Sequence, residues 1–221
     1  MINTGIMMKR LPKFLATAFL LGSVTIALVA CSGNQRVRKP AELVPVSNQF
    51  EMQPVWSTSV GSSESFNFHP VVAGDAVYAA SHSGNITKID LNTGNKVWQA
   101  SVPERLSIGP GSDGRTTVAV STKGTVFAFD DTGKQIWKVS VGSEVLSEPI
   151  VAAGIVIVRA LDNRFIGLDA LTGNRKWVYQ RQQSSLSLRV GYGMLAIGNE
   201  VIVTGFAGGR FGMIAIANGG L

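Results

Sequence analysis

The sequence predicts an all-β protein built as a β-propeller, and three observations support this fold class. Tryptophan recurs at nearly regular intervals, as Trp56, Trp98, Trp137 and Trp177. Between the tryptophans, short segments alternate apolar and polar residues as half-buried strands do, without helical spacing. Each repeat that ends on Trp98, Trp137 or Trp177 also contains a Thr-Gly turn signal. A period of about 40 residues, made of short strands, is typical of propeller blades.

The composition is that of a globular chain behind a basic N-terminus. The 221 residues are 45% hydrophobic and 15% charged, with 25 glycines and 8 prolines, which are proportions of folded proteins. The formal net charge is +6, but Lys9, Arg10 and Lys13 supply three of these charges in the segment 1–30, which contains no acid. The charge of +3 that is left for the rest of the chain is too small to indicate nucleic-acid binding.

Residues 1–30 are predicted to be a secretory signal peptide. The basic stretch 7–13 precedes an uncharged and mostly apolar stretch, 14–30. This apolar stretch is short for a membrane span, and small residues stand at its end, as in a signal peptide. The sequence allows a start at Met1, Met7 or Met8.

Cys31 is the only cysteine of the chain, which excludes internal disulfides and thiolate metal sites. It is either an incidental residue of an apolar segment or the lipidated residue of the tetrapeptide LVAC, which resembles a bacterial lipobox. The lipobox interpretation implies cleavage before Cys31 and several acyl chains, palmitate among them, which anchor a protein stably where one chain is marginal. Ser32 follows where inner-membrane lipoproteins usually carry aspartate, so the resemblance implies the outer membrane, facing the periplasm of a Gram-negative cell.

Residues 31–52 are predicted to form a flexible tether behind the lipidated cysteine. They contain Gly, Pro, Asn, Gln and mixed charges without an apolar period, a composition typical of linkers. The basic residues Arg36, Arg38 and Lys39 either attract anionic lipid headgroups or are solvated linker residues. The partial propeller is then expected over residues 53–221.

Three stretches of the propeller region share one pattern: a strand, an aspartate, a Thr-Gly pair and a tryptophan in the next strand. Glycine permits the positive φ of a tight turn, while Asp and Thr side chains can bond local backbone amides. The tryptophan ring is suited to a seam between blades, where a neighbouring turn carbonyl can accept from the indole N–H. Because these residues recur once per blade, we expect structural roles rather than ligand binding or catalysis. The stretches are 84–98, 124–137 and 163–177, with the aspartates Asp90, Asp130 and Asp169.

The fourth repeat departs from this pattern. Aligning Gly209 with Gly84 places Ala215 where Asp90 stands and Gly219 where Gly94 stands. The next tryptophan would fall at position 223, just beyond the 221 residues. We therefore expect an N-terminal fragment of a larger propeller, with an unclosed sheet edge that is prone to association. The expected blades are 53–98, 99–137, 138–177 and 178–221.

The lipobox, the short tether and the tandem Asp-x-x-Thr-Gly-x-x-x-Trp repeats resemble the BamB family of outer-membrane assembly lipoproteins. The resemblance runs from Cys31 onward and implies an eight-bladed propeller with quinoprotein-like four-stranded blades, of which about four are present. It implies a non-enzymatic scaffold that binds BamA and assists the folding and insertion of β-barrel proteins. Nascent barrel strands are a further expected partner, because sheet edges can pair with them.

A longer loop narrows the choice of family. The stretch from Trp177 to Gly198 exceeds the equivalent stretches of two earlier repeats, 56–74 and 137–154. On the residues alone, Leu186 and Leu188 fit either one face of a buried strand or an exposed contact. BamB-like proteins carry the same Ser-Leu-Ser-Leu-Arg segment and dock it onto the periplasmic POTRA domains of BamA. The resemblance implies Leu186 and Leu188 as apolar anchors and Arg189 as a hydrogen-bonding contact.

Basic residues near this loop allow two interpretations. They either complement an acidic partner or form an ordinary solvated face. The residues are Arg159, Arg164, Arg175, Lys176 and Arg181.

No catalytic or metal-binding pattern is recognisable. His69 and His82 are well separated along the chain and have no cysteine partner, and the sequence contains no nucleophile elbow, phosphate loop or zinc spacing. We expect both histidines to be blade or surface residues, and we expect no cofactor. Two alternatives to the scaffold stay open: a periplasmic ligand-binding or sensor propeller lipoprotein, and a quinoprotein dehydrogenase. Quinoprotein dehydrogenases share the generic blade motif.

Overall fold

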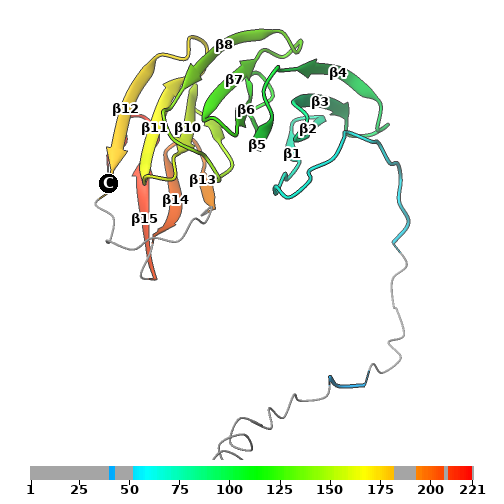
Figure 1. The fold of residues 1–221 in the computed structure, drawn as a ribbon, viewed down its shortest axis with the longest axis horizontal. Helices are drawn as coiled ribbons and strands as arrows, with labels where there is room; N and C mark the ends of the chain where they lie inside the picture. The colour runs from blue at the N-terminus through cyan, green and yellow to red at the C-terminus, as the bar shows by residue number, and fades with distance from the viewer. Residues whose placement is uncertain (1–39, 43–51, 182–192, 207–208, 221) are drawn as a thin grey trace, which may run out of the picture. The chain divides into compact units, whose positions relative to one another are not determined.

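A computed structural model describes residues 40–42, 52–181, 193–206 and 209–220 (Figure 1). The chain divides into two compact units, Met1–Met52 and Gln53–Leu221. The described residues form strands and turns without any helix, which confirms the all-β class. Consequently, this part of the chain contains no helix that is long and apolar enough to cross a membrane. Cys31 and the segment 185–189 lie outside the described residues.

The strands form four antiparallel sheets, and each sheet runs in chain order. The first sheet contains β1 (Val71–Ala73), β2 (Ala76–Ala80), β3 (Asn85–Asp90) and β4 (Lys96–Ser101). The second contains β5 (Leu106–Ser112), β6 (Thr117–Ser121), β7 (Thr125–Phe129) and β8 (Gln135–Ser140). The third contains β9 (Ile150–Ala152), β10 (Ile155–Arg159), β11 (Arg164–Asp169) and β12 (Arg175–Gln180). The fourth contains β13 (Met194–Ile197), β14 (Val201–Phe206) and β15 (Arg210–Ala215).

Successive sheets of the unit Gln53–Leu221 follow one another as propeller blades do. Figure 1 shows them along an arc, with β4, β8 and β12 on its outer side. The inner strands carry the contacts between sheets: β5 contacts β1 and β2, while β9 contacts β5 and β13. This arrangement of four-stranded antiparallel sheets confirms the predicted propeller architecture.

Alternation along the strands explains why the sheets stack. In β10, Val156 and Val158 belong to an apolar cluster with residues of β6 and β7 in the preceding sheet. Ile155 and Ile157 point the other way and belong to a cluster with residues of β14 and β15. Because successive side chains of a strand face opposite sides, one apolar run fills two seams.

The fourth sheet keeps the register of the third. Ala215 pairs with Val201 in β14, just as Asp169 pairs with Ile155 in the third sheet. The structure therefore confirms the alignment of Ala215 with the repeated aspartate. Among the described residues, however, β15 has no neighbour beyond β14.

Candidate partner interface and its frame

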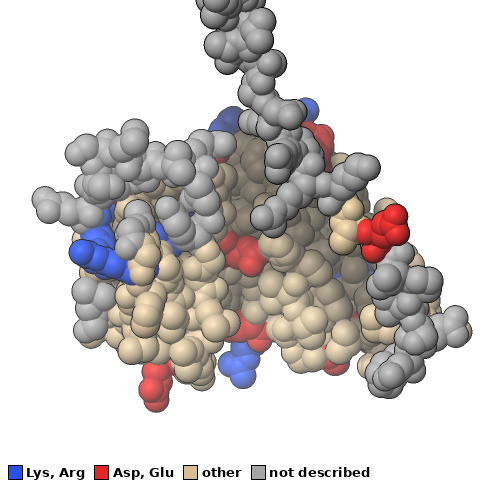
Figure 2. Space-filling model, turned by 90° about the horizontal axis from the view of Figure 1, so that it is seen from below, with Lys and Arg blue, Asp and Glu red and all other residues tan. Residues whose placement is uncertain are grey.

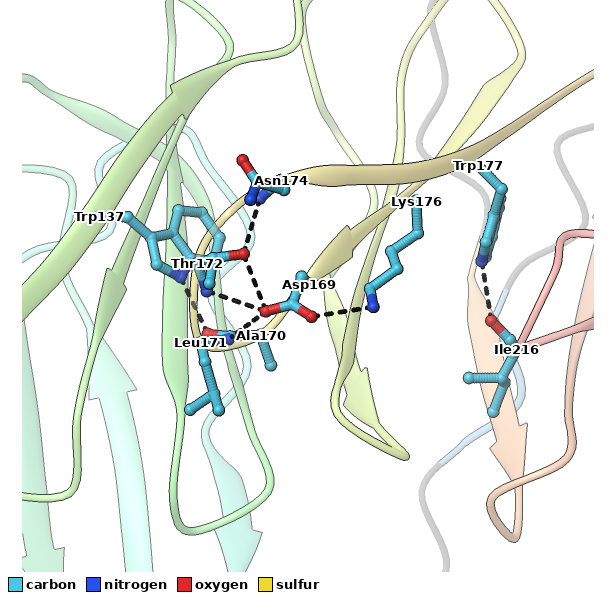
Figure 3. A network of polar contacts seen from close by, with 9 residues as sticks. All are labelled: Trp137, Asp169, Ala170, Leu171, Thr172, Asn174, Lys176, Trp177 and Ile216. Carbon is cyan, nitrogen blue, oxygen red and sulfur yellow. Dashed lines mark hydrogen bonds and ion pairs between the residues drawn. The ribbon is translucent and has the colours of Figure 1, made fainter.

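The repeated tryptophans close the seams between neighbouring sheets (Figure 3). The indole Nε1 of Trp137 donates to the carbonyl of Ala170 at 2.9 Å, and its ring covers Gly173, where a Cβ atom would lie 2.8 Å from it. Trp177 donates to Ile216 at 2.8 Å in the same way. The other two indoles follow the same rule, since Trp56 donates to Leu91 and Trp98 to Asp131. This confirms the predicted structural role of the tryptophans.

The repeated aspartates hold the turns on which the tryptophans rest. Asp169 Oδ1 accepts from the backbone N–H of Leu171 at 3.1 Å and from both the N–H and the hydroxyl of Thr172, at 2.9 and 3.0 Å (Figure 3). Its Oδ2 lies 3.1 Å from Lys176 Nζ. The ammonium of Lys176, followed by the Thr172 bonds, lowers the pKa of Asp169 below its ordinary value. The Asp90 and Asp130 carboxyls have lowered pKa values as well, chiefly because of their Thr93 and Thr132 hydroxyl bonds. These carboxylates serve their own turns, as predicted.

The structure describes the residues on either side of the stretch 182–192, which contains the predicted interface residues and lies outside the described part of the chain. The Arg181 guanidinium lies over the Phe206 ring, 4.6 Å from its centroid. On the other side, the carbonyl of Gly193 accepts a hydrogen bond of 3.1 Å from the hydroxyl of Thr204. Thr204 and Phe206 belong to β14, so the chain leaves and returns beside the same strand.

Arg159 fastens that strand to the preceding sheet. One of its guanidinium nitrogens donates to the Thr204 hydroxyl at 2.7 Å and to the Gly205 carbonyl at 2.9 Å. The guanidinium also lies 4.9 Å from the ring centroid of Phe165 and 5.5 Å from that of Phe206. Arg159 and Thr204 are only 3% and 2% exposed. Together with Arg181 and Gly193, these residues form what we call the β14 frame.

The members of this frame on β14 were not predicted from the sequence. Thr204 and Phe206 lie on the buried side of a strand whose residues alternate, with Ile202, Thr204 and Phe206 buried. That alternation is visible in the sequence and places a threonine on the core face. A core threonine needs a polar partner, which is the signal that points to a buried arginine nearby.

The five basic residues named in the sequence do not form one charged surface, so that prediction is wrong. Arg159 is buried, because the alternation of β10 puts it on the side of Ile155 and Ile157. Arg164 bonds to Asp162 and to the carbonyl of Val141. The remaining three residues lie at opposite ends of β12, because Arg175 and Lys176 begin the strand and Arg181 follows its last residue. Six strand residues span about 20 Å, so these cations do not form one patch.

The two histidines lie in separate surroundings. His82 is buried, its Nδ1 is 2.7 Å from the carbonyl of Leu106, and its ring stacks on Phe66. His69 is exposed and contacts the carboxylate of Glu148. The structure therefore places one histidine in a blade and the other on the surface, as predicted. Within the described part of the chain, no three His, Cys, Asp or Glu side chains are grouped to hold a metal ion.

A family model matches most of the chain. The profile described as "Outer membrane protein assembly factor BamB" matches residues 26–102 and 82–221. A protein of that name from Burkholderia pseudomallei is 39% identical over 205 residues, which cover 92% of this chain and 53% of the relative. The relative from Bordetella pertussis is 37% identical, with 88% and 51% covered.

A solved structure agrees with these sequence matches. The crystal structure of BamB from Moraxella catarrhalis superposes with a TM-score of 0.62 at 26% identity, covering 69% of this chain and 46% of that one. The chain thus spans about half the length of the curated relatives it matches. From the matched profile and the shared blade geometry, we conclude that the chain belongs to the BamB family.

Proposed function

We propose that this chain is a lipid-anchored scaffold of the outer-membrane β-barrel assembly machinery, and that its segment 185–189 binds the POTRA domains of BamA. One observation carries the proposal: the family match runs through both the expected lipidation site and this segment, over residues 26–102 and 82–221. The relatives are named outer-membrane protein assembly factors. In this role Leu186 and Leu188 are apolar anchors and Arg189 a directed polar contact.

The β14 frame supports the display of such a segment. Residues 182–192 begin after Arg181, which lies on Phe206, and end before Gly193, which is bonded to Thr204. Arg159 ties the same strand to β10 through buried hydrogen bonds. A contact segment whose two ends are fixed on one braced strand loses less conformational freedom on binding than a free one.

A non-enzymatic role agrees with how the repeated carboxylates are used. Asp90, Asp130 and Asp169 accept hydrogen bonds from their own Thr-Gly turns, and their pKa values are lowered rather than raised. A general acid working near neutral pH needs a raised pKa. The repeated carboxylates are therefore structural parts of the blades.

The N-terminal part fits a membrane anchor under this proposal. Residues 1–30 serve as signal peptide, Cys31 carries the acyl chains, and residues 31–52 form the tether to the propeller at 53–221. The expected location is the outer membrane, facing the periplasm. Cys31→Ala should shift the protein from the membrane to the soluble fraction, and membrane retention of this variant would refute the anchor.

Co-purification with BamA tests the interface. The full chain and the variant Leu186→Ala/Leu188→Ala/Arg189→Ala are extracted in detergent and captured on tagged BamA. The matched control Leu171→Ala/Arg175→Ala changes an exposed leucine and an exposed arginine elsewhere in the third sheet. We expect binding by the parent and the control, and at least a tenfold loss in the triple variant. Equal capture of a folded triple variant would refute the role of the segment.

A further inference from the structure

His82 is a buried titratable residue at which three segments of the chain meet. It lies in the turn between β2 and β3, and its side chain is only 6% exposed. Its backbone N–H donates to the carbonyl of Ser62 at 3.0 Å, and its own carbonyl accepts from the N–H of Leu106 at 3.1 Å. His82 therefore joins residues 61–66, which precede β1, to the first strand of the second sheet.

A backbone carbonyl decides which ring nitrogen of His82 carries a hydrogen. Nδ1 lies 2.7 Å from the carbonyl oxygen of Leu106, and a carbonyl oxygen can only accept. Nδ1 is consequently the N–H donor in the neutral ring as well as in the protonated one. The ring of Phe66 stacks on the imidazole, with 4.7 Å between the centroids and 13° between the planes. Nε2 is thus the atom at which His82 gains or loses its second proton.

Nε2 of His82 faces one anion and one cation. It lies 3.4 Å from Oε2 of Glu64 and 3.4 Å from Nη1 of Arg105. A neutral Nε2 has a lone pair and no hydrogen, so it can accept from the guanidinium but cannot bond to the carboxylate. A protonated Nε2 donates to the carboxylate and is repelled by the guanidinium. Binding of a proton therefore changes the partner of His82 from Arg105 to Glu64.

The other charged groups nearby are few. Arg105 Nη1 also lies 3.8 Å from Glu64 Oε2, so the two charges can pair when the imidazole is neutral. Glu104, the next residue in the chain, accepts from the hydroxyl of Ser121 at 2.7 Å instead. Figure 2 shows a described surface on which charged side chains are sparse. We call His82, Glu64 and Arg105 the His82 cluster.

The backbone holds Glu64 in place for this contact. Glu64 has a φ of +51°, a left-handed conformation that side chains other than glycine rarely adopt. Its N–H is bonded to the hydroxyl of Ser62 at 3.0 Å, and the N–H of Phe66 is bonded to the carbonyl of Ser63 at 3.0 Å. A strained residue persists where its surroundings hold it, and such residues occur at switch regions.

We propose that the His82 cluster is a proton-sensitive clamp on residues 61–66. When Nε2 takes a proton from water, the imidazolium pairs with Glu64 and holds these residues against the β2–β3 turn and β5. When Nε2 loses that proton, Glu64 is left to Arg105 and the segment is held less tightly. Histidine changes its charge between about pH 5 and pH 8. The attachment should therefore strengthen as the pH falls through this range and weaken as it rises.

The clamp acts on the part of the chain that leads into the first sheet. Residues 61–66 stand in the sequence between the expected tether, 31–52, and β1. Protonation would thus stabilise the entry of the chain into the propeller. The inference concerns described residues alone and is independent of BamA binding.

Hydrogen exchange of single backbone amides tests the clamp in the full chain in detergent. The amides of His82 and Phe66 report on the attachment, because their acceptors are Ser62 and Ser63. Each rate is divided by the intrinsic rate at the same pH. Protection should be about three- to tenfold higher at about pH 5.5 than at about pH 8, between the effects of an exposed ion pair and a charge-assisted hydrogen bond. Leu161 is the internal control, because its N–H makes the equivalent bond in the third sheet without a histidine.

Three substitutions separate the clamp from a general effect of pH. Glu64→Gln removes the counter-charge and should abolish the rise in protection. Arg105→Gln removes the competing cation and should enlarge the rise. Both side chains are more than half exposed, so both variants should fold. Glu148→Gln, which changes the carboxylate beside the exposed His69, should behave like the parent. No rise in the parent, or an equal rise in Glu64→Gln, would overturn the proposal.

Discussion

Replacing Gly173 with alanine should destabilise the fold by more than its backbone conformation explains. Gly173 has a φ of +73°, and a left-handed conformation costs an alanine about 1–2 kcal/mol. The new Cβ would also lie 2.8 Å from the Trp137 ring, and relieving such overpacking costs about 1–3 kcal/mol. A shifted ring loses its bond to Ala170, which is worth about 1 kcal/mol net. We expect the free energy of unfolding to fall by about 3–6 kcal/mol in total.

Gly154→Ala is the matched control. Gly154 lies in the same repeat with a φ of +72°, and a Cβ there would meet nothing within 4 Å. The Gly154→Ala variant should lose only the backbone cost of about 1–2 kcal/mol in its free energy of unfolding. Urea unfolding of the full chain in detergent, followed by tryptophan fluorescence, measures both midpoints. Equal losses for the two variants would refute the claim that the tryptophan requires the glycine.

Three further predictions concern single side chains. Trp137→Phe should lower the free energy of unfolding by about 1–3 kcal/mol, because a buried carbonyl loses its donor. Trp98→Phe should lower it less, because the hydrogen bond of Trp98 is exposed. Thermal unfolding compares the two variants. Arg159→Lys should lower the free energy of unfolding by about 2–4 kcal/mol, because lysine cannot reproduce the two hydrogen bonds and the ring contacts. Arg175→Lys should change it by no more than about 0.5 kcal/mol. Chemical unfolding measures both variants. The pKa of Asp169 is lowered from 3.8, so its contribution is present above that pH and is lost as pH falls through the folded value. Asp169→Asn should therefore flatten the decline of the melting temperature below about pH 4, and an unchanged decline would contradict this role.

The blade unit was predictable from the sequence because its determinants are local. The Asp-x-x-Thr-Gly turn, as in 90–94, uses contacts between near neighbours in the chain. The tryptophan spacing then fixes which turn meets which ring. The acceptor of the indole N–H was predicted as a neighbouring turn carbonyl, and the four bonds found by the structure confirm it.

The surroundings of the interface segment were less predictable because they depend on contacts distant in sequence. Arg159 binds Thr204 and Gly205, which lie 45 and 46 positions further along the chain. Reading charge as surface was therefore wrong for Arg159, although it follows Ile155 and Ile157 on the alternating core face. The roles of Leu186, Leu188 and Arg189 stay predictions that rest on the family resemblance.

The fourth repeat shows which part of the turn the seam requires. Ala215 replaces the aspartate there, yet Trp177 still donates to the Ile216 carbonyl and covers Gly219. The turn keeps its shape through backbone bonds, from the N–H of Gly219 to Ala215 and from the N–H of Ala215 to Gly220. The seam therefore depends on a glycine and a correctly placed carbonyl, and the carboxylate is one of several ways to hold them. Loss of the glycine should consequently damage a blade more than loss of the aspartate.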